Sequence, residues 1–180
     1  NDPDYYAFSV LDFMIGSGGF RSRIFSAVRN HEGLAYSAGS FYRARSNYGI
    51  FGTYAFTKTE STLQSLNLIN DILRNAASGA IQLGELEWAK KSMLNSFIFS
   101  FELPHQIAVQ QMVIEYEKLP ADYLLSYRKK IEAVNIGAVK RVAAAHLNEK
   151  NRLMLILGNT GQFGKLPEEW GQSVLITPNL

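Results

Sequence analysis

The sequence predicts an α+β fold, with helices packed on one face of a mostly antiparallel sheet. Two observations predict it. Helical periodicity gives way to a pair of alternating segments and then resumes over several helices, ending in a short apolar run. At 180 residues, 47% hydrophobic and 19% charged, the chain suits one domain, residues 1–180, with a substantial core. Three or four strands make a thin sheet for so many helices, so we expect a fragment whose first strand or strands lie upstream.

The first third of the chain predicts two helices followed by a hairpin. Residues 4–15 have apolar side chains at helical spacing, "GSGGF" interrupts them, and "RSRIFSAVRNHEG" forms a second short helix that ends at Gly33. Residues 34–45 and 48–57 then alternate, with "SN" as a tight turn between two antiparallel strands. The alternation places Tyr36 on the same face as Ala38 and Ser40.

The remainder of the chain predicts helices and a closing strand. Helical stripes end at Gly79 and Pro104, and "RLMLILG" is typical of a buried strand, with "VLITP" as a further candidate. Two or three further helices are expected, at residues 105–118, 121–132 and 136–147, the last capped by Asn135.

Composition excludes several classes of protein. The chain has 18 basic and 16 acidic residues, so its net charge of +2 provides no general attraction for nucleic acid. It has no cysteine, which excludes disulfides and thiolate metal sites but leaves cytoplasm and periplasm equally open. No segment approaches the roughly 20 apolar residues of a membrane helix, so we expect no membrane segment.

The histidines do not form a recognisable zinc motif. His31 and His105 have no second histidine at helical spacing. His146 is followed by Glu149, as in H-x-x-E-H, but Lys150 stands where the second ligand belongs. We therefore predict no metal site in this chain.

The arginine cluster and the glycine-rich segment each have an interpretation other than nucleic-acid or phosphate binding. Five of the nine arginines fall within 25 residues beside one acid, Glu32, which suits either the rim of a peptide cavity or a solvated face better than a nucleic-acid patch. "IGSGGFRSR" follows a helix and lacks the Lys-Ser/Thr of a phosphate loop, which favours a flexible connection that lines a cavity.

One stretch carries a family resemblance. "SRIFSAVRNHEGLAYSAGSF" is very similar to the signature of the C-terminal-type domain of the insulinase (pitrilysin) zinc metallopeptidases, which include the mitochondrial processing peptidases. "GELEWAKKSMLNSF" and the segment from "LPADYLL" to "LMLILGN" resemble later blocks of that family. The signature positions that match are Gly18, Gly19, Ser22, Arg23, Phe25, Val28, Arg29, Gly33, Leu34, Ala35, Tyr36 and Ala38.

The resemblance implies a division of labour between two facing domains. One domain carries H-x-x-E-H and binds zinc, and the zinc-free domain supplies an arginine and a tyrosine seven residues apart. By resemblance these are Arg29 and Tyr36, as substrate-binding residues, with Gly18, Gly19, Ser22 and Arg23 as candidates for lining the cavity.

The implied partners follow from the same resemblance. They are an H-x-x-E-H domain or subunit that holds the zinc, in cis or in trans, and an extended peptide; a dimer is also open. This chain would hold no cofactor and catalyse nothing alone. Because the family also contains zinc-free scaffold proteins, a structural or assembly module with the same fold is the alternative.

Overall fold

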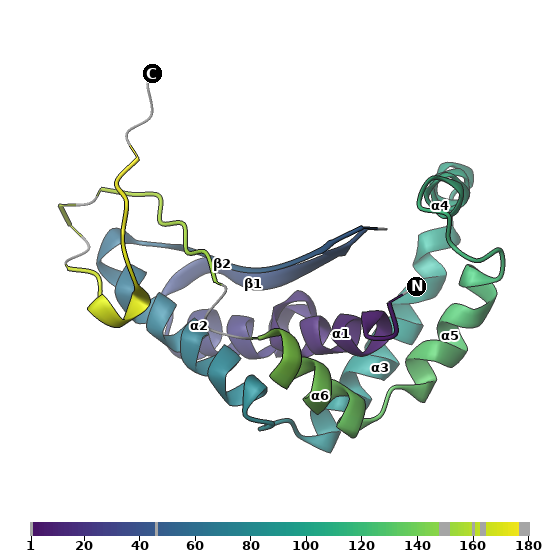
Figure 1. Ribbon diagram of the computed structural model, residues 1–180, viewed down its shortest axis with the longest axis horizontal. Coiled ribbons are helices and arrows are strands. Elements are labelled where there is room, and N and C mark those ends of the chain that lie inside the picture. Colours follow the sequence, from purple (N-terminus) through teal and green to yellow (C-terminus); the bar gives the residue numbers. More distant parts are fainter. Residues whose placement is uncertain (1, 46, 148–151, 160, 163–164, 177–180) are drawn as a thin grey trace.

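The computed structural model describes residues 2–45, 47–147, 152–159, 161–162 and 165–176. Within these residues, one antiparallel hairpin lies over a layer of helices (Figure 1). Strand β1 (Ala35–Ala44) pairs with β2 (Gly49–Thr57). The predicted α+β class, with helices on one face of an antiparallel sheet, is confirmed.

The N-terminal segment forms the layer directly beneath the hairpin. Helix α1 (Tyr5–Asp12) continues into a π-helical turn, η1 (Phe13–Ser17), and a 3₁₀ turn, η2 (Gly19–Arg21). A second π-helical segment, η3 (Phe25–His31), leads into β1. Most apolar side chains of α1 and η1 are almost completely buried, because they fill the space between the sheet and the later helices.

The later helices complete the layer and extend it at one end. They are η4 (Thr59–Ser61), α2 (Thr62–Ala77), α3 (Leu83–Phe97), η5 (Ile98–Phe101), α4 (Pro104–Tyr116), α5 (Tyr123–Ala133), α6 (Ile136–His146) and η7 (Glu168–Trp170). Helix α6 packs against both α1 and α2 below the hairpin, whereas α3, α4 and α5 gather at the end nearest the hairpin turn (Figure 1). Asn135 accepts a hydrogen bond from the Ala138 amide at 2.9 Å, which confirms the predicted cap of α6.

The hairpin has one face on the helices and one face outward. Ala38 pairs with Ala55 and Ser40 with Thr53 on the inner face, while Gly39 pairs with Tyr54 on the outer face. A bulge between Ala35 and Ser37 interrupts this alternation at the start of β1.

The predicted strand at residues 152–158 is wrong for this structure. The described residues there form no regular secondary structure, and Leu153 is 96% exposed. Val174, Leu175 and Ile176, from the second candidate "VLITP", also form no regular secondary structure and are exposed, and the rest of that segment lies outside the described residues. A strand is stabilised by its ladder partner, and the described sheet pairs only β1 with β2.

Candidate functional site

The predicted pair, Arg29 and Tyr36, flanks the tight connection from η3 to β1. The Glu32 amide donates to the carbonyl of Ala27 at 3.1 Å, and the Leu34 amide donates to that of Val28 at 2.9 Å. Gly33 has φ +62°, a left-handed conformation that glycine adopts without strain, and the helical segment ends just before it, as the sequence predicted.

Arg29 lies in the last turn of η3 and rests on aromatic rings. Its guanidinium carbon is 4.8 Å from the Phe25 ring centre and 5.9 Å from that of Phe20, and the two rings meet edge to face. Among the described residues it forms no ion pair. The guanidinium is therefore held in place by cation–π contacts, with its hydrogen-bond donors left for another partner.

Tyr36 lies at the bulge and points away from the core. Its side chain is 85% exposed, although Ala38 and Ser40 are buried on the inner face. The expected shared face was wrong, because a bulge adds a residue to one strand and shifts the alternation. No hydrogen bond joins Arg29 to Tyr36 within the described part of the chain, so their joint role stays a prediction.

The glycine-rich segment packs tightly against the hairpin. Ser22 is completely buried, and its hydroxyl lies 2.7 Å from the Gly19 carbonyl and 3.2 Å from that of Gly16. A Cβ on Gly16 would lie 2.3 Å from the Ser40 amide nitrogen, whereas Gly19, at φ +70°, has open space around it. The linings of two cavities, of about 480 and 360 Å³, include neither Ser22 nor the glycines Gly18 and Gly19.

Arg23 connects this segment to α3. Its guanidinium donates to both carboxylate oxygens of Glu85, at 2.7 and 2.6 Å, and to the carbonyl of Ala80 at 2.7 Å. Burial acts to raise the pKa of Glu85, but the hydrogen bonds from Arg23 and the Gln82 amide outweigh it, so the pKa is lowered. Arg23 also borders a cavity of about 360 Å³ beside Arg21 and His31.

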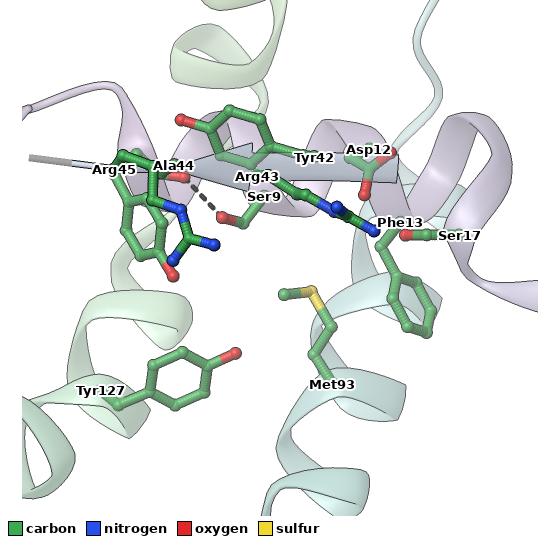
Figure 2. Close-up of a pocket in the computed structure, with 11 residues that line it drawn as sticks. Ser9, Asp12, Phe13, Ser17, Tyr42, Arg43, Ala44, Arg45, Met93 and Tyr127 are labelled. Atoms are coloured by element: carbon green, nitrogen blue, oxygen red, sulfur yellow. Dashed lines mark hydrogen bonds between the residues drawn. The ribbon is translucent and has the colours of Figure 1, made fainter. Parts of the chain in front are cut away.

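A larger cavity, of about 480 Å³, contains none of the predicted site residues (Figure 2). It lies between α1 with η1, the end of β1, α3 and α5. Asp12 borders this cavity. Its side chain is held in place, because only 6% of the residue is exposed and the Ser40 hydroxyl donates a hydrogen bond to its carboxylate. Burial raises the pKa of Asp12. The one signal of this site in the sequence is an aspartate inside an apolar helical stripe.

The described residues supply no metal centre and no membrane span. No three His, Cys, Asp or Glu side chains among them gather into a group that could hold a metal ion. His146 instead contacts the Asp4 carboxylate at 3.1 Å, while Glu149 and Lys150 of the near-motif lie outside the described residues. No helix within the described ranges is long and apolar enough to cross a membrane.

Comparison with known proteins identifies the family. The profile of the family described as "Peptidase M16 inactive domain" matches residues 1–93, just over half of the chain. The solved structure of a peptidase M16 inactive domain from Pseudomonas fluorescens superposes with a TM-score of 0.74 at 28% identity, over 82% of this chain and 35% of that one.

Curated relatives agree and are much longer. The uncharacterized zinc protease YmxG of Bacillus subtilis is 32% identical over 84% of this chain and 37% of its own length. A protein of Helicobacter pylori named as a non-peptidase homolog, also YmxG, is 26% identical over 83% of this chain and 34% of its own length. This chain thus spans about a third of these relatives. The profile match and the structural likeness together place it in the family of peptidase M16 inactive domains.

Proposed function

We propose that this chain is the zinc-free, substrate-binding half of an insulinase-like metalloendopeptidase, folded as a single C-terminal-type domain over residues 1–180. It binds an extended peptide and holds it for hydrolysis by an H-x-x-E-H domain or subunit. Family membership supports the zinc-free assignment, and the lengths of the relatives leave room for a second, zinc-bearing domain.

The observation that carries the proposal is the exposure of Tyr36. A large aromatic side chain that is 85% exposed contributes little to the core, and it follows a turn whose other side holds Arg29 without an ion pair among the described residues. If Tyr36 were an ordinary strand residue, it would be half buried against the helices. If Arg29 served only the helix end, Phe20 and Phe25 would have no reason to hold its guanidinium.

The chemistry suits the two residue types. Arg29 offers a rigid fork of donors with a permanent charge, and the Tyr36 phenol offers one further donor on a strand. Both can donate to a peptide carbonyl and to the negative charge that develops on its oxygen during hydrolysis. A zinc ion in the partner domain would supply the Lewis acid and the activated water.

The test is mutational and uses the full-length or two-subunit enzyme. Arg29→Ala and Tyr36→Phe should each lower peptide hydrolysis by about 10- to 1000-fold, the effect of losing a donor to a developing oxyanion. Zinc content and unfolding midpoint should not change. Arg128→Ala and Tyr48→Phe are the matched controls, since both residues are exposed and lie outside η3 and the start of β1. Full activity in both site variants would refute the assigned role.

A second function is favoured by one relative. The Helicobacter pylori protein is named as a non-peptidase homolog, so a non-proteolytic assembly module of the same fold is the alternative. The sequence of the rest of the gene and of its neighbours would distinguish the peptidase from the assembly module. H-x-x-E-H in a preceding domain of about 200 residues, or in an adjacent family member, favours the peptidase, and its absence from both favours the assembly module.

A further inference from the structure

The cavity beside Asp12 has no part in the proposed function, since it contains neither Arg29 nor Tyr36. Its volume of about 480 Å³ falls within the range of small-molecule sites. The side chains around it come from segments far apart in the sequence (Figure 2). They are Tyr5, Ser9, Asp12, Phe13, Ser17, Tyr42, Arg43, Ala44, Arg45, Met93 and Tyr127.

Aromatic rings form much of the wall, and their neighbours fix them. Tyr127 stacks on Phe97 with ring centres 4.4 Å apart, and the Tyr5 hydroxyl lies 3.0 Å from the hydroxyl of Tyr123. Tyr42 is held by Phe8 at 4.7 Å. Fixed aromatic faces beside a methionine sulfur suit a planar, apolar group, which would lose little further entropy on packing there.

Two guanidinium groups point into the same space (Figure 2). Arg45 pairs with Glu117 at 3.1 Å, so its charge is balanced. Arg43 is exposed and forms no ion pair with any described residue, and its guanidinium carbon lies 5.7 Å from the centre of the Phe41 ring. An unbalanced guanidinium beside these aromatic rings favours a carboxylate, which it can bind with two parallel hydrogen bonds.

The acid in the lining, Asp12, limits the charge of the ligand. The Asp12 carboxylate accepts a hydrogen bond from Ser40 and is nearly buried, so it is already partnered by this chain. Because Arg45 is paired with Glu117, Arg43 is the one lining arginine without an ion pair among the described residues, and the cavity suits a single negative charge better than a dianion. A cation would meet two guanidinium groups, so the aromatic walls do not form a cation site here.

We propose that this cavity binds the C-terminal residue of a peptide, with the terminal carboxylate on Arg43 and an aromatic side chain against Tyr42, Tyr127 and Met93. The assignment to a peptide rests on the proposed function. The binding of an aromatic carboxylate does not, because it follows from the lining alone.

The test compares two probes that differ in one charge. Calorimetric titration of the full-length protein with N-acetyl-L-phenylalanine and with its amide should show the acid binding about 10- to 100-fold more tightly, the effect of a hydrogen bond to a charged group. Arg43→Gln should remove that difference while leaving the affinity for the amide unchanged. Arg128→Gln, an exposed arginine on α5 outside the cavity, should change neither affinity.

Three outcomes would overturn the proposal: equal affinity for acid and amide, no binding of either at millimolar concentration, or an acid preference that survives Arg43→Gln. Met93→Trp, which fills the cavity, should abolish binding of both probes with the unfolding midpoint retained. The titration measures binding and does not depend on proteolysis, so Arg29→Ala should leave the affinities for both probes unchanged. A failed assignment of Arg29 and Tyr36 is therefore distinguishable from a failed assignment of this cavity.

Discussion

Arg23 and Glu85 join the glycine-rich segment to the start of α3 through two parallel hydrogen bonds, although they stand 62 residues apart. Glu85 also accepts from the Gln82 amide at 3.1 Å, so one carboxylate closes the N-terminal end of the helix and anchors the arginine. The pair holds in place the segment that precedes η3, the element that carries Arg29.

Breaking this ion pair should destabilise the fold. Glu85→Gln and Arg23→Lys each remove the paired geometry and should lower the free energy of unfolding by about 1–3 kcal/mol, because the pair is only partly exposed and a charged partner is left behind. Urea unfolding measures the change. Glu87→Gln, on the exposed side of the same helix, is the control, and an equal loss there would contradict the prediction.

Two glycines predict opposite effects of the same substitution. At Gly16 a new Cβ would lie 2.3 Å from the Ser40 amide nitrogen and 2.7 Å from the Gly39 carbonyl carbon, both backbone atoms of β1. Gly16→Ala should therefore separate η1 from the strand and cost about 1–3 kcal/mol or more. At Gly84, inside α3, a Cβ meets open space, so Gly84→Ala should stabilise by about 0.5–1 kcal/mol. Thermal unfolding of both variants measures the contrast.

The sequence predicts those parts of the fold that depend on local pattern. The hairpin and the helices appear where their periodicities place them. As expected, Asn135 caps the start of α6 and Gly33 follows the end of η3. The bulge at Tyr36 could not be predicted, because an alternating run looks the same whether or not an extra residue interrupts the pairing.

The features that sequence reasoning missed depend on contacts between distant segments. The cavity beside Asp12 arises where α1, β1, α3 and α5 meet, and no local pattern records that meeting. Arg23 was expected from the family signature to line a cavity. Its ion pair with Glu85 could not be predicted, because only the tertiary fold brings these two residues together. The apolar run from Leu153 has the composition of a strand, yet pairing rather than composition decides whether one forms.

The buried carboxyl of Asp12 should make stability depend on pH. Folding raises the pKa of Asp12, so the native state binds the proton more tightly and this group's contribution falls as pH rises from about 3.9 through the raised value. Asp12→Asn keeps an acceptor for Ser40 and removes the charge. The variant should gain stability relative to wild type as pH rises, with no gain below pH about 4. Urea unfolding at several pH values measures the difference, and a constant offset would contradict it.

Asp4 should show the opposite dependence. Asp4 pairs with Arg141 at 2.6 Å and with His146 at 3.1 Å, and these contacts connect the start of α1 to α6. The hydrogen bonds lower the pKa of Asp4, and Arg141 contributes more to this shift than His146. The contribution is therefore complete above the unfolded pKa of about 3.9 and is lost as pH falls through the lower folded value.

Asp4→Asn should accordingly destabilise the protein at pH 7 by at most about 1 kcal/mol, because the pair is largely solvated, and the loss should shrink in acid and in high salt. Arg141→Gln should act in the same direction, and the double variant should be less destabilised than the sum of the single ones. Strict additivity of the two changes would show that the contact contributes nothing. Asp71→Asn, in an exposed pair within α2, is the matched control, and it should leave the connection between α1 and α6 intact.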